Sequence, residues 1–124
     1  MRNYKEALII DDDVDLCLTL KSVLHSIIPT IHTANTLTAG KQLVIDLKPE
    51  IVFLDNNLPD GQGINLISFI KQQSPSSFII FITAADTAKD DAIYNGVDVF
   101  LEKPLTYAAI LHAISGLESI RLQV

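Results

Sequence analysis

The sequence predicts an α/β fold in which a five-stranded parallel sheet carries helices on both faces. Two observations support this fold. Short runs of apolar residues, rich in β-branched and aromatic side chains, recur along the chain, as in strands that are buried on both faces. Each run is followed by a segment whose apolar residues recur at helical spacing, so that strand and helix alternate five times.

The chain has 124 residues, a length that suits one domain with a sizeable core. We therefore expect residues 1–124 to form a single domain, with 119–124 as a tail or the start of a linker. The expected strands are Ala7–Ile10, Thr30–Ala34, Ile51–Leu54, Phe78–Ile82 and Val97–Leu101. The second of these has the weakest apolar pattern and is expected at the edge of the sheet.

Capping residues mark the beginnings of the first two helices. Asp12 or Asp13 caps the first helix, and Thr36 caps the second. A fourth helix at about Thr87–Asn95 has few large apolar residues, and a fifth covers Thr106–Leu117. The residues expected to face the sheet are Leu16, Leu20, Val23, Leu24 and Ile27 in the first helix, Ala39, Leu43 and Leu47 in the second, Ile64, Ile67 and Ile70 in the third, Ala88, Ala92 and Ile93 in the fourth, and Ile110, Ala113, Ile114 and Leu117 in the fifth.

The composition excludes several classes of function. A net charge of −6 argues against nucleic-acid binding by this domain, because phosphates are neutralised by clustered Lys and Arg. No apolar run approaches the roughly 18 residues of a membrane span, and no signal-peptide pattern precedes the first strand, so a cytoplasmic protein is expected. Cys17 is alone among apolar residues and is expected in the core. His25, His32 and His112 lack metal-ligand spacing and are expected to be surface or hydrogen-bonded residues.

Polar residues follow four of the expected strands. Asp11–Asp13 follow the first strand, Asp55 the third, Thr83 the fourth and Lys103 the fifth. The carboxyl ends of parallel strands meet at one edge of the sheet, where α/β proteins bind ligands. Clustered carboxylates repel one another and need a cation, and Mg²⁺ prefers such oxygen ligands. There, Asp55 could attack a phosphorus atom while the metal, Lys103 and Thr83 stabilise the phosphoryl oxygens.

Each of these residues, taken singly, has an ordinary structural explanation. Asp13 could be only a helix cap, Thr83 only a strand-end residue, and Lys103 only a surface lysine. Their joint placement after four different strands is what indicates a site.

With this ordered set of motifs, the sequence resembles the receiver domains of two-component response regulators over nearly its whole length. The resemblance implies a flavodoxin-like sheet with strand order 2-1-3-4-5. It also implies that Asp55 accepts a phosphoryl group from a phosphohistidine. Mg²⁺ is then expected to be held by Asp55, by Asp12 directly, by Asp11 through water, and by the backbone carbonyl of Asn57.

The resemblance also assigns the switch residues. They fall on Thr83 and Phe100, and the lysine that binds the phosphoryl group falls on Lys103. A cis peptide bond is expected between Lys103 and Pro104. Phosphorylation would draw Thr83 toward the phosphate, let Phe100 turn inward, and remodel the surface of the fourth helix, fifth strand and fifth helix.

Such a protein would be a signalling switch that catalyses only its own phosphotransfer and dephosphorylation, not an enzyme with a separate substrate. The expected phosphoryl donor is a sensor histidine kinase or a histidine phosphotransfer protein. An effector domain or protein would contact the remodelled surface. The outer side of the fifth helix carries Tyr107, Ala108, Leu111 and Ser115, and this apolar face suits such a partner or a second copy of the chain.

Two other functions stay open from the sequence. A degenerate receiver would only bind proteins, although the intact set of acidic, hydroxyl and lysine residues argues against it. A haloacid-dehalogenase-type phosphatase would use Asp11 as its nucleophile and Asp13 as its proton donor. Such an enzyme normally needs a longer chain and a further acidic motif, at a position where this sequence has Glu102-Lys103-Pro104.

Overall fold

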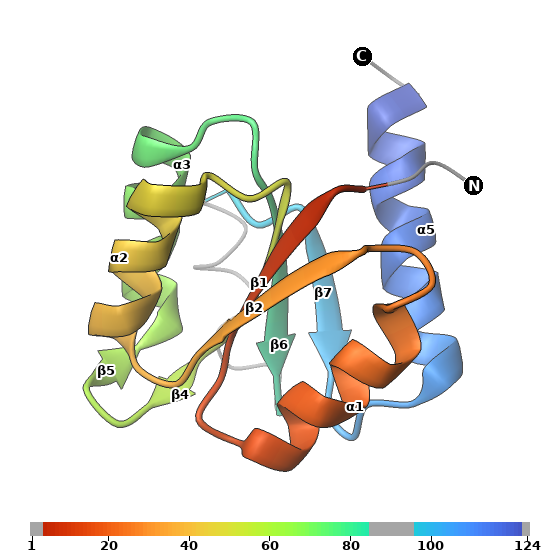
Figure 1. Cartoon of the computed structure of the whole chain (residues 1–124), viewed down its shortest axis with the longest axis horizontal. Coiled ribbons are helices and arrows are strands. Elements are labelled where there is room, and N and C mark those ends of the chain that lie inside the picture. Colours follow the sequence, from red (N-terminus) through yellow and green to blue (C-terminus); the bar gives the residue numbers. More distant parts are fainter. Residues whose placement is uncertain (1–3, 85–95, 123–124) are drawn as a thin grey trace.

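A parallel sheet forms the centre of the molecule (Figure 1). The computed structural model describes residues 4–84 and 96–122. The sheet has five strands in the order β2-β1-β3-β6-β7, and each neighbouring pair is parallel. The strands are β1 (Glu6–Ile10), β2 (Thr30–Ala34), β3 (Ile51–Asp55), β6 (Phe78–Thr83) and β7 (Val99–Glu102). The predicted fold class and strand order are confirmed, with β2 at an edge.

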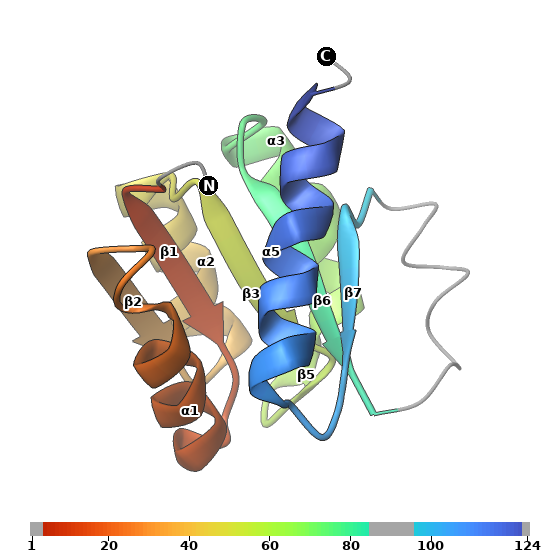
Figure 2. The ribbon, with the colours of Figure 1, turned by 90° about the vertical axis from the view of Figure 1, so that its right-hand side faces the viewer.

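Helices cover both faces of this sheet (Figure 2). They are α1 (Val14–Leu24), α2 (Leu37–Leu47), α3 (Ile67–Gln73) and α5 (Tyr107–Leu122), and a 3₁₀ helix, η1 (Gly63–Leu66), leads into α3. α1 and α5 lie on one face, and α2 and α3 lie on the other. The expected helix at Thr87–Asn95 lies outside the described residues. None of the described helices combines the length and the apolar composition that a membrane crossing requires.

Two apolar cores form, one on each face, because the side chains of a strand alternate between the faces of its sheet. In β1, Ala7 and Ile9 pack with α1 and α5, whereas Leu8 and Ile10 pack with α2 and α3. Each residue of β3 is buried, as predicted for a central strand. Burial of one large aliphatic side chain contributes about 1.5–3 kcal/mol, so these cores fix the strands and therefore the strand ends.

The caps and most of the predicted inner faces are confirmed. Asp13 caps α1 by accepting the N–H of Leu16 at 3.1 Å, and Thr36 caps α2 by accepting the N–H of Ala39 at 3.0 Å. The inner residues predicted for the first, third and fifth helices pack in the cores, and Cys17 is buried with them.

The inner face predicted for α2 is wrong at Ala39, which is exposed. This helix buries Gly40 and Val44 instead. A Cβ atom on Gly40 would lie 2.7 Å from Ile10 Cδ1, so the missing side chain lets α2 approach β1 closely. Leu43 packs against the core as predicted, whereas Leu47 is half-buried and belongs to neither core. A pattern of apolar side chains does not include glycine, so it does not predict that Gly40 faces the sheet.

Several element boundaries differ from the prediction, most of them by one residue and those of β7 and α5 by more. β7 begins at Val99, two residues later than expected, and ends at Glu102. α5 continues beyond Leu117 to Leu122, so residues 119–122 extend the helix. Ile120 lies three residues after Leu117 and packs against the same core, which explains why the helix continues.

A small antiparallel hairpin comes directly after β3, and the apolar pattern does not predict it. It pairs β4 (Asn57–Leu58) with β5 (Gly61–Gln62). Asn56 closes its base, because its carbonyl accepts the N–H of Gly63 at 2.8 Å and its Oδ1 atom accepts the N–H of Ile64 at 3.1 Å. The chain therefore folds back immediately after Asp55.

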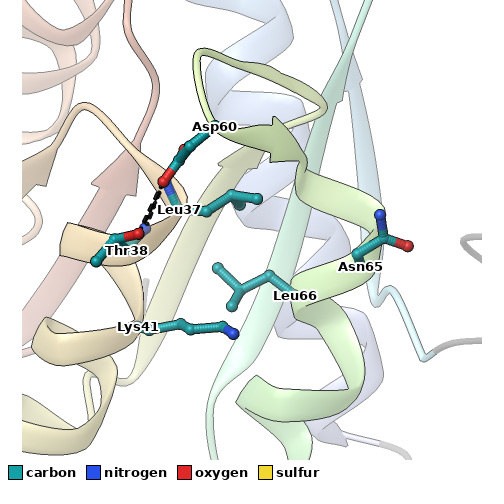
Figure 3. A pocket seen from close by; sticks show the side chains of 6 residues that line it. All are labelled: Leu37, Thr38, Lys41, Asp60, Asn65 and Leu66. Atoms are coloured by element: carbon teal, nitrogen blue, oxygen red, sulfur yellow. Dashed lines mark hydrogen bonds between the residues drawn. The ribbon is translucent and has the colours of Figure 1, made fainter.

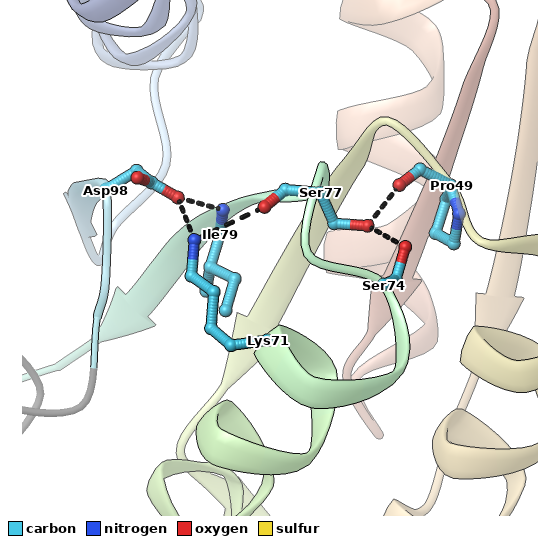
Figure 4. A network of polar contacts seen from close by, with 6 residues as sticks. All are labelled: Pro49, Lys71, Ser74, Ser77, Ile79 and Asp98. Carbon is cyan, nitrogen blue, oxygen red and sulfur yellow. Dashed lines mark hydrogen bonds and ion pairs between the residues drawn. The ribbon is translucent and has the colours of Figure 1, made fainter.

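A polar network joins α3 to the start of β7, at the edge of the sheet opposite Asp55 (Figure 4). Lys71 Nζ donates to Asp98 Oδ2 at 3.1 Å and to the Ser77 carbonyl at 3.3 Å. The same Asp98 oxygen accepts the N–H of Ile79 at 2.7 Å. In this network the Ser77 hydroxyl also donates to the Pro49 carbonyl.

Replacement of Gly63 by alanine is expected to lower the free energy of unfolding by about 1–3 kcal/mol. A Cβ atom at this position would come within 2.0 Å of the Asp55 carbonyl oxygen, and backbone must move to accommodate it. Urea denaturation measures the change. Gly116→Ala is the matched control, because its Cβ would meet only the Val99 side chain, at 3.2 Å, and alanine favours the helix by about 1 kcal/mol. Equal stability of the two variants would contradict the expectation.

Candidate functional site

Three carboxylates meet at the carboxyl edge of the sheet. β1 and β3 are neighbours with Ile10 opposite Leu54, so the next residues, Asp11 and Asp55, emerge side by side. Asp11, Asp12 and Asp55 each place a carboxylate oxygen within 4.8 Å of the others. The acidic cluster that the sequence predicts is therefore present.

Burial controls the ionisation of this cluster. The exposed fractions of Asp11 and Asp55 are 0% and 2%, whereas Asp12 is exposed. Burial raises the pKa of Asp11 from 3.8 to about 6; the N–H of Asp13, 2.8 Å from Asp11 Oδ1, opposes this shift, and the charge of Asp55 adds to it. Burial also raises the pKa of Asp55, against the opposing hydrogen bond and charge of Lys103.

Both oxygens of Asp55 have partners. Lys103 Nζ lies 3.1 Å from Oδ1, and the N–H of Asn57 donates to Oδ2 at 3.2 Å. Burial lowers the pKa of Lys103, but the hydrogen bond and charge of Asp55 outweigh it and raise the pKa above its usual value. The lysine is therefore a fixed positive charge beside the Asp55 carboxylate at neutral pH.

The acidic cluster fits a divalent cation. Among the described residues, Asp11 Oδ2 is a buried oxygen without a hydrogen-bond partner. A buried carboxylate oxygen is costly unless it is protonated or meets a donor or a cation. Hard oxygen donors from Asp11, Asp12 and Asp55 are the ligands that Mg²⁺ prefers, and several waters usually complete its octahedron.

Of the remaining predicted residues, Thr83 and Lys103 lie at the carboxyl edge of the sheet, and Phe100 lies within a strand. Thr83 ends β6, one residue beyond the Ile82 that lies opposite Asp55, and its carbonyl accepts the N–H of Lys103 at 2.9 Å. It therefore lies at the same edge as the acidic cluster. The Lys103–Pro104 peptide bond is cis, as predicted.

Phe100 lies within β7 rather than at the edge. It is half-buried and stands opposite Phe81, with the two ring centroids 6.3 Å apart and the planes at 88°. This is an edge-to-face arrangement between two strands of the sheet. It puts Phe100 on the face that α2 and α3 cover.

Three polar residues that sequence reasoning missed hold the surroundings of the site. Asn35 Nδ2 donates to the Asp11 carbonyl at 2.9 Å, Asn56 closes the hairpin, and Asp60 accepts hydrogen bonds from the start of α2. Asn35 and Asn56 directly follow β2 and β3, and Asp60 lies between Pro59 and Gly61, which are positions typical of turn residues. That signal does not identify partners more than 20 positions away.

Other candidates have structural roles in the part of the chain that is described. Asp13, the proton donor required by a phosphatase mechanism, has its side chain engaged in capping α1. His25 and His112 are exposed, and His32 Nε2 lies 2.9 Å from Glu6 Oε2, as expected for surface or hydrogen-bonded histidines.

Sequence comparison agrees with the geometry. The doubly wound sheet and its acidic edge define a receiver-type domain. The sequence model of the response regulator receiver domain matches residues 7–115, so the chain belongs to this family of signalling domains.

Curated relatives include two bacterial transcriptional regulatory proteins. The chain is 32% identical over 104 residues to DpiA of Escherichia coli (strain K12), covering 81% of this chain and 46% of DpiA. It is 35% identical over 111 residues to YxdJ of Bacillus subtilis (strain 168), covering 88% of this chain and 48% of YxdJ. The chain spans about half the length of these relatives.

Solved structures include receiver domains with the same fold. The beryllofluoride-activated NtrC4 receiver domain dimer matches with 32% identity and a TM-score of 0.81, covering 92% of this chain and 97% of that one. A Burkholderia pseudomallei response regulator with a phosphorylated aspartic acid, a calcium ion and citrate matches with 26% identity and a TM-score of 0.82, covering 97% of this chain and 73% of that one.

Replacement of Asp11 by asparagine is expected to stabilise the metal-free protein at pH 7.5 by about 1–3 kcal/mol. The folded-state pKa of about 6 exceeds the usual 3.8, so the folded protein binds more protons than the unfolded chain between these values. Stability of the wild type therefore falls as the pH rises from about 4 to about 6, and the deficit is complete above that range. Asparagine keeps the acceptor for the N–H of Asp13 without the charge.

Urea denaturation at pH 4 and pH 7.5 in the presence of a chelator measures this effect. The difference between Asp11→Asn and wild type should nearly vanish at pH 4. Asp46→Asn, at an exposed position of α2, is the control for loss of one negative charge from a chain of net charge −6. Equal stabilisation by both variants would show that general repulsion, not burial of Asp11, is responsible.

Proposed function

We propose that Asp55 is the phosphoacceptor of this receiver domain and takes a phosphoryl group from a phosphohistidine. One observation carries the proposal: the carboxylate of Asp55 is held at the end of the central strand between a lysine ammonium at 3.1 Å and two further carboxylates. In the transfer, an Asp55 oxygen forms a bond to phosphorus while the phosphorus–nitrogen bond breaks and its electron pair stays on the imidazole. The protein is thus a switch that is itself modified.

Asp11, Asp12, Asp55 and the backbone carbonyl of Asn57 would hold Mg²⁺. The unpartnered Asp11 Oδ2 and the oxygen-only donor set support this assignment. The bound ion supplies positive charge against the phosphoryl oxygens and relieves the repulsion among the carboxylates. The Asn57 N–H, which donates to Asp55 Oδ2, keeps that carboxylate from rotating away.

Lys103 and Thr83 would bind the oxygens of the transferred group. Lys103 already touches the carboxylate that is to be modified, so its ammonium needs only a small shift to contact a phosphoryl oxygen. Thr83 supplies a hydroxyl from the neighbouring strand end. The new dianion then favours the packing in which Thr83 moves toward the phosphate and Phe100 turns further inward. This change would alter the surface of the fourth helix, β7 and α5.

The donor that fits this site is a protein, either a sensor histidine kinase or a histidine phosphotransfer protein. Val14 and Leu18 lie one turn apart on α1 beside the acidic cluster, and they are 62% and 58% exposed. Next to them is a cavity of about 260 Å³ between α1 and the segment after β7, lined in part by Thr19, Lys103 and Leu105. Exposed apolar residues around a charged site suit a protein surface.

We propose that residues 1–124 act as one receiver domain whose output is read by an effector domain or protein. Two of the relatives are transcriptional regulatory proteins about twice as long as this chain, which supports an effector of that kind. Tyr107, at 65% exposure, and Leu111 give the outer side of α5 an apolar surface for this contact or for a homodimer. The NtrC4 receiver domain is a dimer when activated with beryllofluoride, which supports the homodimer.

Incubation with acetyl phosphate and Mg²⁺ is expected to add one phosphoryl group to the wild type and none to Asp55→Asn. Intact-mass spectrometry measures the gain, and chelation of Mg²⁺ should abolish it. Asp46→Asn, an aspartate far from the site on α2, serves as the matched control and should gain the group like the wild type. An unmodified wild type would favour a degenerate, protein-binding receiver, and modification of the Asp55 variant would move the acceptor to Asp11.

A further inference from the structure

We infer that Asp60 is a positioning residue that holds the hairpin carrying Asn57 against α2 and thereby sets the affinity of the acidic cluster for Mg²⁺. The inference rests on the proposed function, which makes the Asn57 carbonyl a metal ligand. Asp60 itself belongs to the turn between β4 and β5 and does not take part in the cluster.

Asp60, from a distant part of the chain, accepts hydrogen bonds from the first residues of α2 (Figure 3). Its Oδ1 accepts the N–H of Leu37 at 2.7 Å, and its Oδ2 accepts the N–H and the hydroxyl of Thr38 at 3.0 and 2.9 Å. The first N–H groups of a helix have no partner within the helix, and the first turn of α2 contains no acidic residue of its own. These hydrogen bonds lower the pKa of Asp60, so it is ionised and suited to the positive end of the helix dipole.

The tip of the hairpin also packs directly on the helix. Gly61 has φ +150°, and a Cβ atom there would lie 2.7 Å from Leu37 Cδ1. Two consecutive residues, Asp60 in the turn and Gly61 at the start of β5, therefore contact the first turn of α2. The hairpin base is fixed by Asn56, so Asn57 lies between two anchored points.

The same end of α2 is tied to the other side of the acidic cluster. Asn35, two residues before α2, donates to the Asp11 carbonyl at 2.9 Å, and the N–H of Asp11 donates to the Ala34 carbonyl at 3.0 Å. The segment from Ala34 to Thr38 thus contacts the loop after β1 and the hairpin after β3. It braces the two loops that supply the metal ligands.

A brace of this kind matters for Mg²⁺ in particular. The ion requires near-octahedral geometry at short metal–oxygen distances, so a displaced carbonyl is not easily accommodated. Outer residues that orient metal ligands typically change metal affinity or activity by about 10–100-fold when they are replaced. Loss of the Asp60 hydrogen bonds would leave only the packing of Gly61 on Leu37 at the tip of the hairpin, and so would loosen one of the two points that hold Asn57.

Thr36 offers a matched control for the alternative that Asp60 is only a helix cap. Its hydroxyl accepts the N–H of Ala39 at 3.0 Å and so caps the same end of α2 from within the helix's own segment, whereas Asp60 does so from the hairpin. Asp60→Ala and Thr36→Ala both remove a cap from this helix. Only Asp60→Ala removes the hydrogen bonds that join the hairpin to it.

Isothermal titration calorimetry with MgCl₂ on the whole chain tests the inference. Asp60→Ala is expected to raise the Kd for Mg²⁺ by about tenfold, whereas Thr36→Ala should stay within about twofold of the wild type. Asp60→Asn keeps an acceptor oxygen and should show a smaller increase, and it also serves as the folded test variant if Asp60→Ala does not fold. Urea denaturation without Mg²⁺ should show lower midpoints for both alanine variants.

Phosphorylation by acetyl phosphate adds a second readout. At saturating Mg²⁺ the Asp60 variants should recover the wild-type rate, because their defect is in metal affinity. An unchanged Kd in both Asp60 variants, or an equal rise in Thr36→Ala, would overturn the inference. A wild type that binds no Mg²⁺ would overturn the proposed function and this inference together, so the two failures are distinguishable.

Discussion

Repulsion between carboxylates at neighbouring strand ends is the constraint on which the site depends. In a parallel sheet, adjacent strands lie about 4.8 Å apart, and both strands end at the same edge of the sheet. The sheet therefore forces Asp11 and Asp55 together, and burial removes the water that would screen them. Lys103 supplies one positive charge to a cluster of three acids. The remaining negative charge favours binding of a divalent cation at this edge. Without the cation, the same charge would repel the oxygens of a phosphoryl group.

Packing on both faces of the sheet keeps these charges in place. Each strand that carries a site residue lies between two cores, and these cores are built mainly from aliphatic and aromatic side chains. The loops after the strands contribute few side chains to these cores, among them Leu58 and Leu105. Side chains of Asn35, Asn56 and Asp60 hold them instead, through hydrogen bonds to backbone groups. Apolar burial thus fixes the strand ends, and polar contacts fix the loops beyond them.

Most of the fold can be predicted from the sequence because strands and helices leave strong periodic patterns. The strand runs, the caps Asp13 and Thr36, and the acidic residues that directly follow the first and third strands are all local signals. The pattern fails where the deciding contact is distant or involves no side chain. In α2, Gly40 faces the sheet because its backbone packs closely against Ile10. A pattern of apolar side chains does not predict this contact, since glycine has no side chain.

The same distinction applies to the site. Residue type and strand position are enough to find its charged members. The partners of Asp60 are two backbone N–H groups and a hydroxyl, 22 and 23 residues earlier in the chain, so no spacing rule identifies them. The 3.1 Å contact between Lys103 and Asp55, by contrast, is expected once both strands are known to end at one edge.

The contact of Asp98 with Ile79 has a consequence for how β7 joins the sheet during folding. Side chains alternate with a period of two, so a slip by one residue would move Phe100 to the opposite face and carry Lys103 away from Asp55. Asp98 Oδ2 receives both the Ile79 N–H and the Lys71 ammonium when the strands are correctly aligned. A strand shifted by one residue would lose both contacts. Asp98 therefore stabilises the correct register at one end of β7, and this register places Lys103 beside Asp55 at the other end.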